Sequence, residues 1–509
     1  MTRIRRPLRA ACTLAAAALA VAVAAPAQAT PSHGTPSHGT PSESARPTAR
    51  TERVSVGLGH AQPDGASQAG GLSADGRYAV FTSDATNLVP GDTNGKSDVF
   101  VRDLWTGRTE RVDTGPDGVQ ADGDSYEATI SGNGRYVAFS SYATNLAPGA
   151  VLGSADVYVH DRWTGRTSLV SAPRTPGAPQ TNKVSAQPSI SSDGRSVVYQ
   201  SNRSDLAPGT VTWFGGNIYV SDLRTGETTL VSVGADGKEA DASSTDPEIS
   251  ADGTTVVFIS KATNLIAPNR PDALSPNAVA RLAAGSDEEF TTDSLRPGPR
   301  PTSSLRTDSP RTDSLRAGAR AAILKPRTYP LYVRDLRAGR TQLASPDGNG
   351  GYRGAVNPSM SPDGRYAVYS SWVLHGDSQF DRHFEVYARD LKLGTETLIS
   401  TGLPGTKTTA DSLAARMTAD DRWVFFSSWA DNLVPGDTNQ ASDIFRHDLW
   451  TGRTERVDLA DDGSQGAGSD GPFVDAFGTA VVFTSPDGAL VPGDTNHVPD
   501  VFLRRLPLF

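Results

Sequence analysis

The sequence predicts an all-β fold: a seven-bladed β-propeller of four-stranded antiparallel blades, closed by an N-terminal strand that pairs into the last blade. Three observations predict it. One sequence unit recurs seven times, its period is nearly constant, and each unit divides into four short strands without intervening helices. Repeats of four strands at a fixed period are the sequence signature of propeller blades.

The repeat is plain in two units, GRYAVFTSDATNLVPGDTNGKSDVFVRDLWTGRTERVD (76–113) and GRYVAFSSYATNLAPGAVLGSADVYVHDRWTGRTSLVS (134–171). One turn residue opens the second strand of every unit. The intervals between these residues are 58, 60, 59, 111, 57 and 57. Removing about 53 residues from the fourth interval makes the period uniform. The turn residues are Gly76, Gly134, Gly194, Gly253, Gly364, Asp421 and Gly478.

Each unit contains four strand signals in the same order. A short run such as PSIS (188–191) is followed by a turn of the type Ser-x-Asp-Gly, which favours a tight reversal. The second run, such as YAVFTS, is apolar without alternation, as in a strand buried on both faces. A third run such as DVFVRDL and a turn such as WTGRT precede the fourth run, TERVD or TLVS. We therefore expect four antiparallel strands in each unit.

The last unit lacks a fourth strand, and the missing run lies at the other end of the sequence. Residues 50–55, RTERVS, match the RTERVD of 108–113 and 453–458. We expect this N-terminal strand to pair into the seventh blade, because such closure removes exposed sheet edges. The propeller should then span residues 51–509.

Three regions lie outside the repeat. Residues 1–29 combine a basic start, an apolar run and Ala-x-Ala, which predicts a signal peptide and a secreted, extracellular protein. Residues 30–50 are rich in Pro, Ser and Thr and predict a disordered linker. A basic insertion at about 270–327 holds nine Arg and one Lys against five Asp and two Glu. We expect it to be disordered, either as a tolerated insertion or as an arm for an anionic glycan.

The runs SPDGRYAVYSS (361–371) and DVFVRDLWTG (98–107) resemble the TolB-like, WD-like propeller repeats of bacterial exported proteins. The resemblance covers the chain after the linker. It implies the propeller fold and leaves the task open, because such repeats serve many functions.

Composition narrows the function classes. The formal net charge of −9 argues against a nucleic-acid partner. The single cysteine, Cys12, lies within the predicted signal peptide, so the mature protein should have no disulfide and no cysteine-based metal site. We expect a monomer without a transmembrane segment.

No motif for a nucleophile elbow, a zinc protease or a phosphate loop occurs in the sequence. His375 and His383 flank the loop HGDSQFDRH, where they are candidates for a metal site or an acid–base pair. His160 and His447 are interpreted as solvated strand-end residues. The aspartate of VRDL, as in Asp103, recurs in six units, which indicates that it accepts hydrogen bonds from the following turn rather than acting in catalysis.

The loop before the third strand is the best candidate for a bound ion. In three units it reads Asp-Thr-Asn-x-x-x-Asp, with oxygen ligands at alternate positions that suit Ca²⁺. The alternative is an Asx-turn that caps the loop without metal. The candidate ligands are Asp92, Asn94, Asp98, Asp437, Asn439, Asp443, Asp494, Asn496 and Asp500.

The residues therefore favour a non-catalytic binding or scaffold module for a protein or glycan partner, contacted through the loop face or the central channel. No cofactor other than Ca²⁺ is predicted. The alternative is a glycan-active lyase or hydrolase with its site at the channel mouth. A cluster of His, Arg, Tyr or Lys side chains at that mouth would favour the enzyme.

Overall fold

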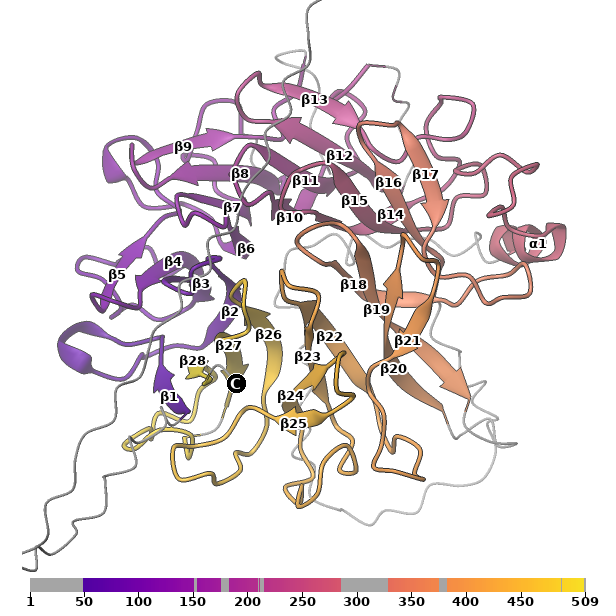
Figure 1. The fold of residues 1–509 in the computed structure, drawn as a ribbon. Helices are drawn as coiled ribbons and strands as arrows, with labels where there is room; N and C mark the ends of the chain where they lie inside the picture. The colour runs from indigo at the N-terminus through magenta and orange to yellow at the C-terminus, as the bar shows by residue number, and fades with distance from the viewer. Residues whose placement is uncertain are drawn as a thin grey trace, which may run out of the picture. The chain divides into compact units, whose positions relative to one another are not determined.

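The protein is a ring of seven four-stranded antiparallel sheets around a central axis, as the repeats predict (Figure 1). The computed structural model describes residues 49–150, 153–174, 183–208, 210, 215–284, 328–374, 382–486 and 488–507. The predicted signal peptide and nearly all of the predicted linker lie outside these ranges. No helix in the described part is long and apolar enough to cross a membrane.

Every blade has an inner strand that lines the axis and a second strand outside it. Starting from blade 1, the inner strands are β2 (Ser67–Leu72), β6 (Ser125–Ile130), β10 (Ser185–Ile190), β14 (Ser244–Ile249), β18 (Ala355–Met360), β22 (Ser412–Met417) and β26 (Asp470–Val474). The second strands are β3 (Tyr78–Ser83), β7 (Tyr136–Ser141), β11 (Ser196–Ser201), β15 (Thr255–Ser260), β19 (Tyr366–Leu374), β23 (Trp423–Ser428) and β27 (Ala480–Ser485).

The third and fourth strands complete each blade outward. The third strands are β4 (Asp98–Asp103), β8 (Asp156–Asp161), β12 (Asn217–Asp222), β16 (Leu331–Asp335), β20 (Arg382–Asp390), β24 (Asp443–Asp448) and β28 (Asp500–Arg505). The outermost strands are β5 (Arg108–Arg111), β9 (Arg166–Leu169), β13 (Glu227–Leu230), β17 (Arg340–Leu343), β21 (Glu396–Leu398), β25 (Thr454–Arg456) and, in blade 7, β1 (Arg50–Arg53).

The predicted closure is confirmed. β1 pairs antiparallel with β28, with Thr51 opposite Arg504 and Arg53 opposite Phe502. The pairing continues beyond the strand, because the Val54 amide donates to the Val501 carbonyl at 2.7 Å. In Figure 1 the indigo N-terminal strand lies beside the yellow C-terminal strands. The two ends of the sequence therefore share one sheet.

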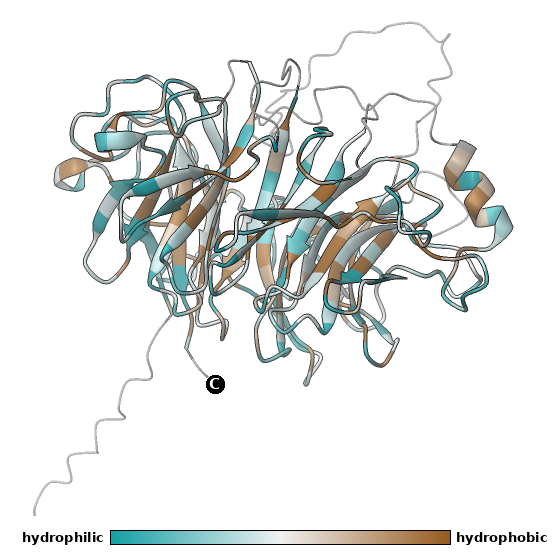
Figure 2. Cartoon of the chain, turned by 90° about the horizontal axis from the view of Figure 1, so that it is seen from above, coloured by the Kyte–Doolittle hydropathy of each residue, from teal (hydrophilic) through white to brown (hydrophobic). Residues whose placement is uncertain are grey.

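Each blade carries the same aromatic pair in its core. A residue of the second strand stacks on its cross-strand partner in the third, with centroids 5.7–6.1 Å apart. In blade 1 the pair is Phe81 and Phe100, both fully buried. Brown hydrophobic bands recur along the strands in Figure 2. Aromatic stacking adds to the burial of large apolar area, so these pairs hold neighbouring strands together in every blade.

The basic insertion begins with ordered structure in the described residues. A short helix, α1 (Pro276–Ala284), lies inside the segment that the sequence analysis expects to be disordered. Ala278 and Leu282, four residues apart, are buried, because one face of this helix turns inward. Residues 285–327 lie outside the described ranges. Two short 3₁₀ turns, Leu58–His60 and Pro116–Gly118, complete the helical elements of the described chain.

Candidate functional site: the central channel

A cavity of about 560 Å³ lies on the axis and is lined by the inner strands of all seven blades. At one end its lining is apolar and includes Leu72, Ile130 and Met417. Its lining also reaches Trp429 and Pro499, in the loops at the opposite ends of the inner strands. The cavity is thus apolar at one end, and its other end lies among the loops between second and third strands.

The middle of the channel is shaped by a bulge in every inner strand. Each strand shifts register against its neighbour, as between Tyr126 and Thr129 of β6. Six of the bulges place a residue in the left-handed region, and blade 1 has Gly70 at the equivalent point. These residues are Glu127 (φ 51°), Gln187 (φ 55°), Asp246 (φ 51°), Asn357 (φ 46°), Ala414 (φ 55°) and Gly471 (φ 66°).

Positive φ is costly for residues other than glycine, roughly 1–2 kcal/mol each. Five such residues at one level of one channel make this the most strained backbone layer described. β-bulges re-aim side chains and often border functional sites. Sequence reasoning missed these positions because the seven residues share no chemistry; the only hint is a following proline in blades 3, 4, 5 and 7.

The bulge residues divide the channel into two sectors. Blades 2–5 contribute Glu127, Gln187, Asp246 and Asn357, whereas blades 6, 7 and 1 contribute Ala414, Gly471 and Gly70. One side of the channel therefore presents carboxylates and amides, and the other presents almost no side chain at this level.

Hydrogen bonds join the polar bulge residues from blade to blade. The backbone amide of Gln187 donates to Glu127 Oε2 at 2.7 Å. The Gln187 side chain donates to Asp246 Oδ1 at 3.1 Å and accepts from the Asp246 amide at 3.2 Å. Ser140 supports Glu127 at 3.2 Å. This network holds the polar groups of blades 2–4 in place before any ligand arrives.

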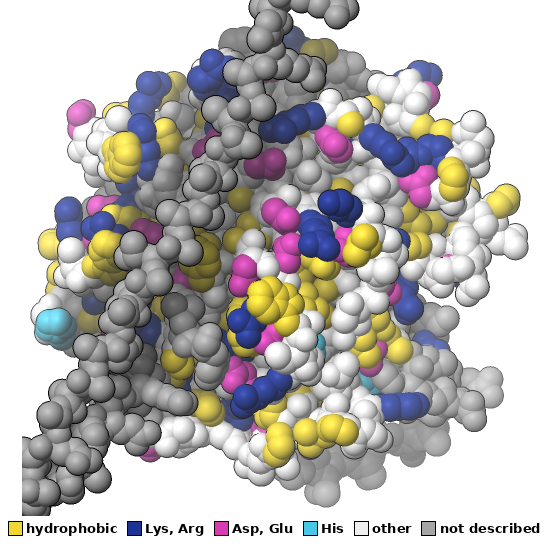
Figure 3. Space-filling model, viewed as in Figure 1, with side chains coloured by type: hydrophobic (Ala, Val, Ile, Leu, Met, Phe, Trp, Pro, Cys, Tyr) yellow, Lys and Arg dark blue, Asp and Glu magenta, His cyan; other side chains and the backbone are white. Residues whose placement is uncertain are grey.

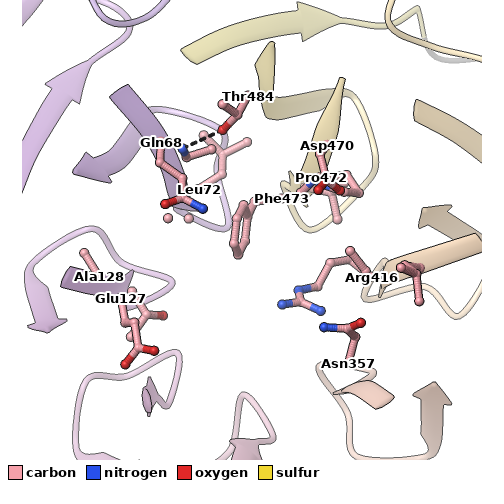
Figure 4. Close-up of a pocket in the computed structure, with 18 of the residues that line it drawn as sticks. Gln68, Leu72, Glu127, Ala128, Asn357, Arg416, Asp470, Pro472, Phe473 and Thr484 are labelled. Atoms are coloured by element: carbon pink, nitrogen blue, oxygen red, sulfur yellow. Dashed lines mark hydrogen bonds between the residues drawn. The ribbon is translucent and has the colours of Figure 1, made fainter. Parts of the chain in front are cut away.

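Two large side chains from the other sector project into the same space (Figure 4). Arg416 of β22 lies with its guanidinium carbon 5.3 Å from the centroid of the Phe473 ring. Its Nη1 donates to the Ala415 carbonyl at 2.9 Å, and it forms no ion pair with a described residue. Figure 4 places Glu127 across the cavity from Arg416 and Asn357. The channel thus offers an aromatic face, one cation and several oxygen acceptors.

At the apolar end, the turns between first and second strands are linked around the axis by backbone hydrogen bonds. Ala74 donates to Gly132, and Ala476 donates to Ala74, each at 3.0 Å. Similar bonds join the other neighbours except blades 5 and 6, where Pro362 has no N–H to donate. There Arg365 reaches Asp421 of the next blade at 3.4 Å. This ring keeps the inner strands, and hence the bulges, in register.

The nine candidate calcium ligands lie in three matching loops, one each in blades 1, 6 and 7. In each, the asparagine side chain donates to the last aspartate, as Asn94 does to Asp98 at 2.8 Å. An arginine from the outermost strand of the same blade lies between the two aspartates. Arg111 contacts Asp92 at 3.0 Å and Asp98 at 3.2 Å.

The other two loops have the same arrangement. Arg456 contacts Asp437 at 3.1 Å and Asp443 at 2.6 Å. Arg53 of β1 lies 3.2 Å from both Asp494 and Asp500. The described residues hold no cluster of three or more His, Cys, Asp or Glu arranged to bind a metal. Calcium at these loops stays a prediction, with the guanidinium as the competing counter-ion.

A glutamine that sequence reasoning missed completes each of these loops. Gln120 accepts from the Thr93 and Asn94 amides at 3.0 and 3.1 Å and from Arg111 at 3.1 Å. Gln465 and Gln62 play the same part in blades 6 and 7. The glutamine follows the arginine by nine residues in each case, which is the signal that could have revealed it.

Blades 1 and 6 bury a further carboxylate beside these loops. Asp458 is fully buried, 3.1 Å from Arg456. Burial raises the pKa of Asp458 to about 6, and burial together with the negative charge of Asp458 raises the pKa of Asp443 to about 8. Burial and Asp98 likewise raise the pKa of Asp113. Blade 7 has Ser55 at this position, donating to Asp500 at 2.6 Å.

No histidine of the described residues lines the channel. His375 lies outside the described residues, and His383 lies on β20 in the third layer of blade 5. The interpretation of His160 and His447 as solvated is wrong: they are 6% and 5% exposed, because their side chains face the fourth strand. Burial lowers the pKa of His160 to about 4.

The repeated aspartates have the structural role that the sequence predicts. Asp103 accepts from the Trp105 amide at 3.0 Å and also pairs with Arg77 at 2.7 Å. The hydrogen bond from Arg77 holds the pKa of Asp103 near 2. Arg77 is stacked between Tyr78 and the exposed Trp105, with centroids 4.8 and 4.6 Å away. On the face displayed in Figure 3, both charge signs are interspersed with apolar side chains.

Comparison with known proteins assigns no family to this chain. No protein-family model and no curated protein matches this chain. Among solved structures, the propeller domain of the trilobed protease from Pyrococcus furiosus is similar, with 10% identity and a TM-score of 0.44 over 87% of this chain and 96% of that one.

TolB from Acinetobacter baumannii is similar at 12% identity and a TM-score of 0.34, covering 85% and 81% of the two chains. A prolyl endopeptidase matches 82% of this chain but 46% of its own, at 12% identity and a TM-score of 0.43. The protein is a seven-bladed β-propeller in fold, and these distant similarities carry no argument about its ligand.

Proposed function

We propose that the protein is an exported, non-catalytic binding module whose central channel takes a segment of a protein or glycan partner. The observation that carries this proposal is the bulge layer. Backbone strain is retained at one level of the channel, where it directs polar side chains of blades 2–5 into the cavity. Pockets with a few convergent polar groups above an apolar lining are the usual sites for ligands.

The lining supports a ligand that donates hydrogen bonds. Glu127, Asp246, Glu248 and Asp470 are acidic, and Arg416 is the basic residue in the lining. Carboxylate and amide oxygens accept from hydroxyl, amide or ammonium groups. The small residues Ala414 and Gly471 leave room for a ligand at the level of the bulges, and the Phe473 ring offers an apolar face to it.

Ala414→Gln tests the channel with little risk to folding, because Gln187 occupies the same bulge position in blade 3. The added side chain would fill the open sector. Partners are captured from proteins and polysaccharides of the exporting cells with wild type, with A414Q and with a control, Ala338→Gln, in an exposed outer turn. We expect A414Q to lose the partner that wild type and A338Q retain. Equal retention by all three would overturn the channel as the binding site.

The alternative, a glycan-active enzyme, is distinguished by turnover. The same proteins are incubated with the captured polysaccharide, and new reducing ends or unsaturated products are measured. Product formation that depends on Glu127 or Asp246 would replace the binding module with an enzyme.

A further inference from the structure

A second pocket, of about 230 Å³, lies between the outer parts of blades 4 and 5. Its lining includes Arg340 and Gln342 of β17, Arg389 of β20, and Arg270 with Asp272 from the start of the insertion. It is distant in the fold from the channel, because β17 is the outermost strand of its sheet. Three guanidinium groups and one carboxylate surround a space large enough for a small ligand group.

Arg389 departs from a rule that the other six blades obey. The residue before the repeated aspartate, whether Arg, His or Ser, forms a hydrogen bond with a threonine of the outermost strand, at 2.7–3.0 Å. In blade 5 the cross-strand partner is Glu396 instead. Glu396 pairs with Arg353 at 3.1 Å and accepts from Tyr369. Arg389 is left without a hydrogen bond or ion pair to any described residue.

The facing wall carries a neutral amide, Gln342 of β17. As the strand registers show, the equivalent residue is an acid in blades 1, 6 and 7 (Glu110, Glu455 and Glu52) and a hydroxyl residue in blades 2, 3 and 5 (Ser168, Thr229 and Thr397). Glu110 pairs there with Arg162 of the next blade. Blade 4 has a neutral amide at this position, opposite Val333. Because Gln342 is neutral, this wall offers no carboxylate to the arginines of the groove.

The insertion supplies the third wall. Arg270 donates to the Thr341 carbonyl at 3.0 Å, which ties the insertion to the edge of β17. Both oxygens of Asp272 are engaged by Arg270, at 2.6 and 2.8 Å. Asp272 therefore neutralises Arg270 and not the other two. Arg340, exposed at the start of β17, forms no ion pair within the described chain.

We propose that this groove binds a phosphate-type oxyanion, held between the guanidinium groups of Arg340 and Arg389 with the Gln342 amide as a further donor. Two like charges in one pocket are unfavourable unless an anion joins them. The planar guanidinium matches the geometry of phosphate or sulfate oxygens. The oxyanion comes either from free inorganic ion or from an ester or anhydride of an anionic polymer.

Inorganic phosphate and long-chain polyphosphate serve as probes on the mature protein. Binding is measured by calorimetry and by the shift in melting temperature, against sodium chloride at matched ionic strength. We expect phosphate to bind, and Arg389→Gln to weaken binding by about tenfold or more, as expected for loss of a charge-assisted hydrogen bond. Gln342→Glu should weaken it similarly, because it restores the acid found in blades 1, 6 and 7.

Arg108→Gln is the matched control, since it removes the exposed arginine at the Arg340 position of blade 1. It should bind as wild type does. Polyphosphate that binds much more tightly than phosphate, with the same loss in Q342E, assigns the site to a polymer; equal affinities assign it to the free ion. Absence of binding by both probes, or equal losses in R108Q, R389Q and Q342E, would overturn the groove as a specific site.

Discussion

Blades 6, 7 and 1 differ from blades 2–5 in where they place charge. The first group holds three matching loops, in which an arginine contacts two aspartates, and it has no side chain larger than a methyl group at the bulge positions of the channel. The second group lacks this loop sequence, carries polar residues at the bulges, and has the uncompensated arginines of the groove. Internal ion pairs thus reinforce the sector that contains the seam between the chain ends.

Blades 6, 7 and 1 and blades 2–5 thus use the same repeat in different ways. Where β1 must pair with β28 without a covalent link, each neighbouring loop is satisfied by its own blade. In blades 2–5 other pairs are present, as between Arg203 of blade 3 and Asp156 of blade 2. The polar bulge residues and the arginines of the groove both lie in these blades, so both proposed sites depend mainly on blades 2–5.

The largest effect should come from removing the seam strand. A chain beginning at residue 57 loses β1, the buried Val54 and the hydrogen bond from Ser55 to Asp500. It also exposes the edge of β28, so we expect aggregation and a loss of at least about 4 kcal/mol in the free energy of unfolding. A chain beginning at residue 47 is the control. Equal melting temperatures for the two chains would contradict a stabilising seam.

Removing a loop arginine should cost nearly as much. Arg456→Met leaves Asp437, Asp443 and Asp458 buried without their counter-ion, and we expect a loss of roughly 3–5 kcal/mol by urea denaturation. Arg389→Met, in the other sector, should change stability by less than about 0.5 kcal/mol because no described group depends on it. Similar losses in both variants would remove the distinction between the two sectors.

The dependence of stability on pH should distinguish blades 1 and 6, which bury an additional aspartate, from blade 7, which has Ser55 at that position. The raised pKa values of Asp443 and Asp458 mean that the folded protein binds more protons than the unfolded chain, so this contribution to stability is complete below about pH 4 and is lost as pH rises to 8. Asp458→Ser copies Ser55. We expect it to gain roughly 1–2 kcal/mol at pH 8 and little at pH 4, by denaturation at both pH values. A gain that is the same at both would contradict the burial of excess carboxylates.

The smallest effect concerns calcium. Because each Asp-Thr-Asn loop already holds a guanidinium, we expect millimolar chelator to leave the melting temperature unchanged. A fall that added calcium chloride reverses would instead establish the nine loop residues as ligands.

The repeats alone predicted the number of blades, the order of the strands and the pairing of the N-terminal strand into the last blade. RTERVS matches the fourth strand of other units, so it could be recognised as the strand that the seventh unit lacks. The site was harder to predict. The bulge residues of the seven blades are of six different types, and only backbone geometry shows that Glu127 and Asn357 occupy one layer. Arg111 and Gln120 follow the Asp92 loop at a distance, so the loop alone suggested a metal. The prediction that His160 is solvated was wrong because the fourth strand of the blade covers this side chain of the third strand.

Hydrogen–deuterium exchange with and without the captured partner tests the division of the ring most directly. We expect the partner to slow exchange at the bulges of β6, β10, β14 and β18, and to leave the loops around Asp92, Asp437 and Asp494 unchanged. Protection confined to those three loops, with free exchange in the four inner strands, would contradict it.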